Sequence, residues 1–205
     1  PAPDDWGPNE YYLSDLEWVS ATHGDATTTK TVQKDHPFTP GNNGNDTKIS
    51  LLMPDGTIRT FDKGLGTVAA SPSIITYNLT GARVSELHTY IGIDRTAAPL
   101  DSNHAVVEKV EIVVDDVVLY TSVTDHPAGI VYSTSAIEVT LEIPDGAKKL
   151  ELKSYAGTHT WGDEVVFADA KITAHGPFSN SWEPAEKRRE ISNEFPLMII
   201  PLYAN

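Results

Sequence analysis

Short runs in which apolar and polar residues alternate recur along most of this chain, and clusters of turn residues separate them. Alternation with a period of two predicts strands that bury one face, and none of these runs has the 3.6-residue period of an amphipathic helix. The fold is therefore predicted to be all-β, as an antiparallel β-sandwich. The expected strands lie at 12–21, 32–35, 49–53, 58–61, 73–79, 84–92, 106–114, 117–123, 137–143, 150–155 and 165–175.

The stretch from Lys63 to Leu79 holds two glycines one residue apart, followed by a clear alternating run. Gly64 and Gly66 allow the backbone either to turn tightly or to approach another strand closely. We therefore expect other parts of the chain to be docked against this segment. Asp55-Gly56, between two short apolar runs, predicts a β-hairpin.

The pattern divides the chain into three parts. Residues 1–10 are rich in Pro, Asp and Gly and are typical of a linker. Residues 11–175 carry the strands of the sandwich, and residues 176–205 form a C-terminal extension. In this extension, 184–191 is the one candidate helix. The apolar run 195–203, broken by two prolines, is either an edge strand or the first strand of a following domain.

Composition narrows the class of partner. The 205 residues carry a net charge of −14 and no cysteine. Nucleic acid and anionic lipid both require clustered Lys and Arg, so we expect neither nucleic-acid binding nor membrane insertion. No apolar run approaches the roughly 20 residues of a transmembrane helix. A neutral or cationic partner, or a divalent cation, fits this composition.

Trp161 lies in a polar loop between two expected strands. An indole face beside His159, Asp163 and Glu164 is the usual platform for a sugar, because a pyranose has an apolar face and hydroxyls that need partners. The alternative is a tryptophan that simply packs on the surface. Trp18 falls in strand register, so we expect it to pack in the core or at a sheet edge.

The sequence contains none of the local motifs that mark common catalytic or zinc sites. Oxygen ligands for a hard cation such as calcium are present instead, in the loop after residue 35 and near residue 169. Asx-turns and a solvated surface explain the same residues equally well. The candidate ligands are Asp35, Asn42, Asn43, Asp46 and Asp169.

Several motifs, in order and spacing, resemble the NPCBM domain, classed as carbohydrate-binding module family 51. The resemblance spans about residues 11–175. The motifs are Tyr12-Leu-Ser-Asp-Leu-Glu-Trp-Val-Ser-Ala-Thr, Val32-Gln-Lys-Asp, Lys63-Gly-Leu-Gly-Thr, Tyr77-Asn-Leu, Tyr90-Ile-Gly-Ile-Asp, Glu111-Ile-Val-Val-Asp and Trp161-Gly-Asp-Glu-Val-Val-Phe-Ala-Asp-Ala-Lys-Ile.

This resemblance implies a galactose-binding-like jelly roll without catalytic activity, attached to the catalytic domain of a secreted or cell-surface bacterial glycosidase. It implies binding of galactose- or N-acetylgalactosamine-containing host glycans on the loop face near Trp161, where Trp161 would stack on the sugar ring. It also implies a structural calcium ion, for which we expect the ligands Asp35, Asn43, Asp46 and Asp169.

The sequence departs from the family's pattern at the positions that usually carry donors. Val68 stands in the place of a His, and Glu164 and Phe167 stand in the places of a His and a Trp. Each lost donor leaves a buried sugar group unpaired, at a cost of about 1 to 3 kcal/mol. Two functions therefore remain open. One is a glycan-binding module, and the other is a structural spacer whose sugar site has degenerated.

Overall fold

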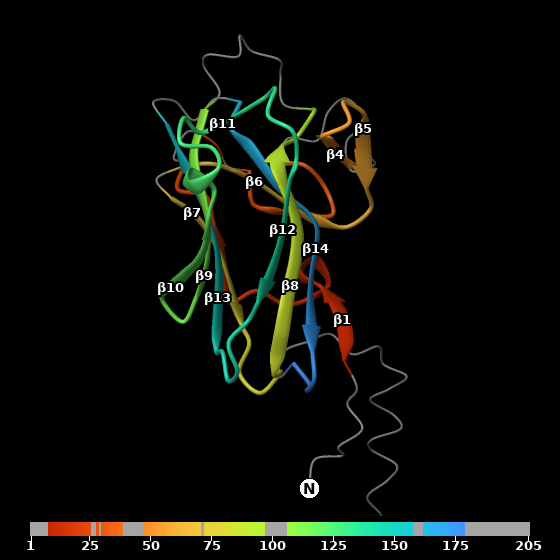
Figure 1. Cartoon of the computed structure of the whole chain (residues 1–205), viewed down its shortest axis with the longest axis vertical. Coiled ribbons are helices and arrows are strands. Elements are labelled where there is room, and N and C mark those ends of the chain that lie inside the picture. Colours follow the sequence, from red (N-terminus) through yellow and green to blue (C-terminus); the bar gives the residue numbers. More distant parts are fainter. Residues whose placement is uncertain are drawn as a thin grey trace, which may run out of the picture.

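The computed structural model describes residues 8–25, 28, 30–38, 47–70, 72–96, 106–157 and 162–178, which form a β-sandwich (Figure 1). Besides strands, this part of the chain contains two short 3-10 helices, η1 (Leu13–Asp15) and η3 (Ser122–Thr124). No helix in the described ranges is long and apolar enough to cross a membrane.

Two sheets, in which every pair of neighbouring strands is antiparallel, form the sandwich. The first has the order β12 (Ile137–Glu142), β8 (Val84–Ile93), β14 (Glu164–Ala174), β6 (Gly64–Val68) and β3 (Gln33–Lys34), with β1 (Asn9–Tyr12) also paired to β14. The second has the order β10 (Val117–Thr121), β9 (Val106–Val114), β13 (Lys149–Ala156), β7 (Ser73–Asn78) and β2 (Ser20–Thr22), with β11 (Ile130–Val131) paired to β9.

The main core lies between these sheets and follows from the alternation in the strands. In β13 every second residue is buried, and Leu150 and Leu152 contribute apolar side chains there to the core. Leu87 and Ile91 contribute in the same way from β8. Because residues two apart in a strand point to one face, this alternation fixes which side of each strand enters the core.

A smaller second core lies on the outer face of the first sheet. The hairpin of β4 (Ile49–Leu52) and β5 (Ile58–Phe61) packs there, with Leu51 and Phe61 against Val166. The Asp55-Gly56 turn joins these strands, so the predicted hairpin is confirmed.

The predicted strand at 12–21 is wrong in its extent. The chain leaves the first sheet after β1, forms η1, and joins the second sheet only at β2, so this segment crosses between the two sheets. Leu13 is fully buried, and its carbonyl accepts a hydrogen bond from the Tyr77 hydroxyl at 2.8 Å. Trp18 is half-buried beside the core, with Lys34 Nζ 4.7 Å from its ring centroid.

The glycine pair at 64 and 66 lies in a strand, not in a turn, so of the two interpretations the close approach is confirmed. All five residues of β6 are buried. A Cβ at Gly66 would lie 2.3 Å from the His36 carbonyl oxygen, and one at Gly64 would lie 2.6 Å from the Phe167 carbonyl oxygen. Only glycine therefore lets the neighbouring backbones pack against β6 on both sides.

The predicted division into linker, module and extension stays a prediction. β1 begins at Asn9, so the last two residues assigned to the linker form the first half of a strand, paired with Ala174 and Thr173. The candidate helix 184–191 and the apolar run 195–203 lie outside the described residues.

Candidate functional site

One end of the sandwich, which we call the loop end, carries the start of β14 together with β11 and the β4–β5 hairpin (Figure 1). Two of the predicted sugar-binding residues, Trp161 and His159, lie outside the described residues. Of the other two, Glu164 is the first residue of β14 and Asp163 directly precedes it. The structure thus places the described half of the predicted sugar site at the loop end.

Glu164 and Asp163 have different surroundings. Glu164 is half-buried, stands opposite Val68 across the β6–β14 pair, and accepts a hydrogen bond from the Asp94 N–H at its own carbonyl at 2.9 Å. Asp163 is 0% exposed, and neither of its carboxylate oxygens has a hydrogen-bond partner among the described residues. Burial raises the pKa of Asp163 from 3.8 to about 7. The carboxylate lies below the surface, and its role as a sugar contact stays a prediction.

Val68 and Phe167, which replace donors of the family's pattern, both lie in the interior. Val68 is 4% exposed and Phe167 is 1% exposed. Phe167 belongs to the main core and stands opposite Leu65 in β6. These two side chains therefore fill space between strands and present no surface to a ligand.

A polar group that the sequence did not single out joins β4 to the segment after β8 at the loop end. Asp94 is fully buried, and its carboxylate accepts hydrogen bonds from the Ser50 N–H at 2.8 Å and the Thr96 N–H at 2.8 Å. Burial raises the pKa of Asp94, and these hydrogen bonds oppose the rise.

The next residue, Arg95, stacks on the Tyr132 ring and forms two hydrogen bonds with Tyr132. Its guanidinium lies 3.4 Å from the Tyr132 ring centroid and donates to the Tyr132 carbonyl at 2.7 Å, and the Tyr132 hydroxyl donates to the Arg95 carbonyl at 3.2 Å. This contact joins residues 37 apart in sequence. No local pattern could have revealed it.

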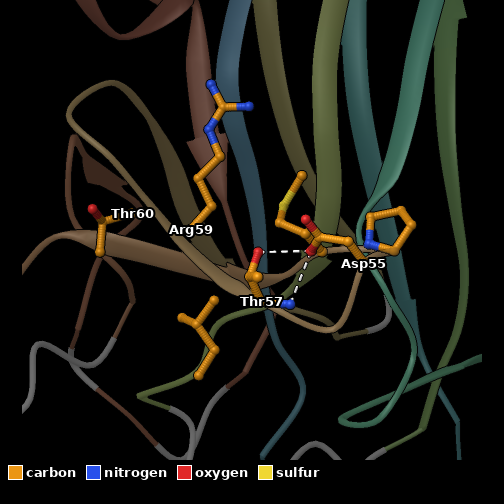
Figure 2. Close-up of a pocket in the computed structure, with 7 residues that line it drawn as sticks. Asp55, Thr57, Arg59 and Thr60 are labelled. Carbon is orange, nitrogen blue, oxygen red and sulfur yellow. Dashed lines mark hydrogen bonds between the residues drawn. The ribbon is translucent and has the colours of Figure 1, made fainter.

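A shallow pocket lies on the β4–β5 hairpin (Figure 2). Its lining residues are Met53, Pro54, Asp55, Thr57, Ile58, Arg59 and Thr60. The Asp55 carboxylate is already engaged, because one of its oxygens accepts from the Thr57 N–H at 2.9 Å and from the Thr57 hydroxyl at 2.7 Å. Arg59 stacks over Phe61 with 4.6 Å between its Cζ and the ring centroid. None of the predicted site residues that the structure describes lines this pocket.

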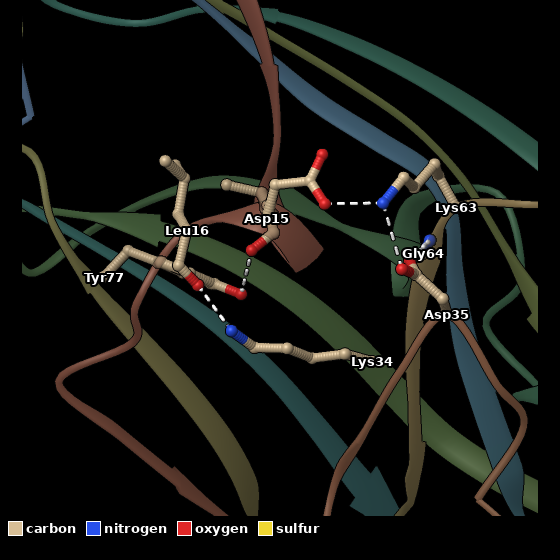
Figure 3. Close-up of polar contacts among 8 residues, drawn as sticks. Asp15, Leu16, Lys34, Asp35, Lys63, Gly64 and Tyr77 are labelled. Atoms are coloured by element: carbon tan, nitrogen blue, oxygen red, sulfur yellow. Dashed lines mark hydrogen bonds and ion pairs between the residues drawn. The ribbon is translucent and has the colours of Figure 1, made fainter. Parts of the chain in front are cut away.

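The described part of the predicted calcium site is occupied by an ion pair. Lys63 Nζ bridges Asp15 Oδ1 at 2.5 Å and Asp35 Oδ2 at 3.0 Å (Figure 3). The other oxygen of Asp35 accepts from the Gly64 N–H at 3.2 Å. Asp169 lies in a register shift of β14, where its N–H donates to the Lys63 carbonyl at 2.9 Å. Asp35 is therefore already paired with a lysine, which it shares with Asp15.

The remaining oxygens of that loop leave the prediction open. Asn42, Asn43 and Asp46 lie outside the described residues. The Thr47 hydroxyl at the end of the loop is buried and has no hydrogen-bond partner in the described part of the chain, which suits a cation ligand. Among the described residues no group of three or more His, Cys, Asp or Glu side chains is placed to hold a metal ion. Calcium in the 35–46 loop stays a prediction.

Comparison with known proteins adds the following findings. The sequence model of the NPCBM/NEW2 domain matches residues 9–173. A blood-group-substance endo-1,4-beta-galactosidase from Clostridium perfringens is 61% identical over 198 residues, which cover 96% of this chain and 25% of that protein. The chain thus spans about a quarter of the curated relative that it matches.

Three solved structures extend the comparison. The tandem CBM51 modules of the family 98 glycoside hydrolase from Streptococcus pneumoniae SP3-BS71 match with a TM-score of 0.78 and 51% identity, over 88% of this chain and 51% of that one. CBM51 from Clostridium perfringens GH95, in complex with methyl-galactose, matches with a TM-score of 0.65 and 28% identity, over 80% and 99%. CBM51-2 of Clostridium perfringens ZmpB, with GlcNAc and INT domains, matches with a TM-score of 0.63 and 26% identity, over 92% and 36%.

Proposed function

Because this chain belongs to the NPCBM/NEW2 domain family and has the galactose-binding-like β-sandwich of CBM51 modules, we propose that it is a non-catalytic carbohydrate-binding module. Its ligands in this proposal are host glycans that contain galactose or N-acetylgalactosamine. The observation that carries the proposal is the match to a CBM51 module in complex with methyl-galactose. The match to an endo-galactosidase that is much longer than this chain supports a catalytic domain in the same polypeptide as its partner.

We place the glycan at the loop end, near the start of β14. In this proposal Trp161 stacks on the apolar face of the sugar, while His159 and Glu164 offer hydrogen-bond partners to its hydroxyls. Asp163 lies below the surface, so it would reach a hydroxyl only if the segment before β14 shifted. The proposed setting is secreted or cell-surface and bacterial.

A structural spacer is the second candidate, and one observation favours it. Val68 and Phe167 occupy the positions of expected donors, and both are buried. A site that has lost those donors holds a sugar less tightly, because some hydroxyls remain unpaired on binding. In the spacer case the sandwich would only hold neighbouring domains apart.

Glycan binding by the isolated chain separates these two functions. A glycan array should detect galactose- or N-acetylgalactosamine-terminated ligands, and calorimetry should measure their affinity. Trp161→Ala should weaken binding by about 1 to 3 kcal/mol, or roughly 5- to 150-fold, because an aromatic stacking contact is lost. Trp18→Phe is the matched control and should leave the affinity unchanged, since Trp18 packs beside the core.

Two results would contradict the proposal. If the wild-type chain binds no glycan on the array, the spacer function is favoured. If the wild type binds and Trp161→Ala binds equally well, the sugar site lies elsewhere on the module. Circular dichroism of each variant confirms that a loss of binding does not reflect unfolding.

A further inference from the structure

The pocket on the β4–β5 hairpin has no part in the function proposed above. Its volume is about 650 Å³, which lies in the range of small-molecule sites. All of its lining residues come from the hairpin, between positions 53 and 60. Leu51 and Phe61 pack the hairpin against Val166 of the first sheet. One element, fixed to the sandwich by its own core, therefore builds the whole pocket.

Two charged side chains of the pocket are held in place by their neighbours. Asp55 Oδ1 accepts from both the N–H and the hydroxyl of Thr57, and the other oxygen, Oδ2, has no hydrogen bond to another described residue (Figure 2). The Arg59 guanidinium stacks on two rings, with its Cζ 4.6 Å from the Phe61 centroid and 5.3 Å from the Tyr90 centroid. Because both groups are already oriented, ordering them costs little when a ligand binds.

The lining combines an acceptor, donors and an apolar surface. Asp55 Oδ2 can accept from a hydroxyl, and the guanidinium N–H groups of Arg59 can donate to one. Ile58 is 60% exposed, one of five large apolar side chains exposed in the described part of the chain, and Met53 and Pro54 line the same pocket. A pyranose has the complementary features, because it presents an apolar face and hydroxyls that both donate and accept.

The charge of the pocket favours a neutral ligand. Asp55 and Arg59 are the two charged lining residues, and their charges are opposite. An anion would be repelled by Asp55 and by the chain's net charge of −14, and a cation would be repelled by Arg59. A neutral hydroxyl can instead donate to the carboxylate or accept from the guanidinium, and both bonds are strengthened by the charged partner.

We propose that the β4–β5 hairpin binds a neutral saccharide, with Asp55 Oδ2 and the Arg59 guanidinium as partners of its hydroxyls and Ile58 against its apolar face. The ligand class rests on the proposed glycan-binding function, but these residues are separate from the loop that holds Trp161. The hairpin and the start of β14 both lie at the loop end (Figure 1). Two units of one branched glycan bound there together would raise the overall affinity.

NMR titration of the ¹⁵N-labelled chain with the blood-group A trisaccharide, which carries no charge, tests the hairpin. The amide signals of residues 53–60 should shift as the trisaccharide is added, and their shifts give a dissociation constant. Arg59→Ala should raise this constant by about 10-fold, because the hydrogen bonds of a charged donor are lost. Ile58→Ser should raise it by about 3-fold, because part of the apolar contact is lost.

Arg83→Ala and Val19→Ser are the matched controls and should leave the dissociation constant unchanged. Arg83 precedes β8 at the opposite end of the module, where it donates to the His175 carbonyl. Val19 is 64% exposed, as Ile58 is 60% exposed, but it lies outside the pocket. Circular dichroism confirms that each variant is folded.

Titration of Trp161→Ala separates the hairpin site from the proposed function. Shifts at residues 53–60 that remain in Trp161→Ala and weaken in Arg59→Ala support the hairpin site. Shifts confined to the start of β14 leave glycan binding intact and overturn the hairpin site, as do shifts at 53–60 that disappear in Trp161→Ala. Equal dissociation constants for wild type, Arg59→Ala and Ile58→Ser also overturn it. No shift anywhere contradicts glycan binding itself and overturns both proposals.

Discussion

At the scale of single residues, Asp94 and Asp163 show that burial alone does not define the role of a carboxylate. Both have 0% exposure, and at the loop end Asp94 directly follows β8 while Asp163 directly precedes its neighbour β14. Asp94 closes a local network with Ser50 and Thr96, so it stabilises the fold as a hydrogen-bond acceptor. Among the described residues Asp163 has no such network, because neither of its carboxylate oxygens meets a hydrogen-bond donor.

Asp94→Asn should destabilise the fold by about 1 to 3 kcal/mol, because one acceptor oxygen becomes an amide that faces a buried N–H. Urea unfolding gives the free energy. Asp55→Asn is the matched control, since Asp55 accepts the same kind of bonds from Thr57 in an exposed turn, and it should lose clearly less. Similar losses in the two variants would show that the burial of the Asp94 network does not matter.

Asp163 should make the stability of the cation-free chain depend on pH. Its pKa is raised to about 7, so between about pH 4 and 7 the folded state binds more protons than the unfolded state. The stability that the neutral carboxyl contributes is then present below about pH 4 and is lost as the pH rises through 7. Urea unfolding in choline chloride with EDTA should show wild type losing up to about 4 kcal/mol relative to Asp163→Asn between these limits.

The Asp163→Asn variant has no charge to titrate at this position, so the pH dependence of its unfolding free energy is the baseline for the comparison. A difference between the two proteins that stays flat from pH 4 to 8 would contradict the raised pKa of Asp163.

At the scale of elements, β6 packs closely against its neighbours because two of its residues have no side chain. Its two glycines let the backbone near His36 and the backbone near Phe167 approach from both sides, where any Cβ would collide. Asp35 and Lys63 reinforce the same contact, because the Asp35 carboxylate accepts from the Gly64 N–H and pairs with Lys63 (Figure 3). β6 is thus packed tightly between β14 and β3.

Gly66→Ala should destabilise the fold by at least about 2 kcal/mol, because its Cβ would lie 2.3 Å from a backbone oxygen that cannot move alone. Gly92→Ala is the graded control. Its Cβ would lie 2.9 Å from the Leu51 Cδ2, the end of a flexible side chain, so the loss should be smaller. Thermal unfolding of both variants shows which substitution lowers the stability more. A larger loss of stability in Gly92→Ala than in Gly66→Ala would contradict this account of β6.

At the scale of the whole molecule, the long strand β14 connects the two ends of the sandwich. It starts at the loop end and finishes beside β1, the first strand of the described chain (Figure 1). Glu164 therefore lies at one end of the sandwich, and the start of β1 and the finish of β14 lie at the other. A single strand therefore links the loop end of the sandwich to the end at which β1 begins.

The sequence by itself determined the fold class, most strands and the family. The expected strands at 84–92, 106–114 and 137–143 match β8, β9 and β12 to within a residue, because one buried face imposes a period of two. β6 and β11 were not among the expected strands, and the expected strand at 12–21 is wrong for a physical reason. Its residues belong to two sheets, and which sheet a residue joins depends on distant partners such as Tyr77.

Only the tertiary structure decided which polar residues have partners. The contacts between Arg95 and Tyr132 and between Asp35 and Lys63 join residues that local spacing does not relate. The sequence placed Asp163 in a polar loop among possible sugar contacts, yet the chain folds it beneath the surface. Hydrogen bonding and desolvation depend on what the folded chain brings within about 3 Å, and alternation along a strand carries no information about that.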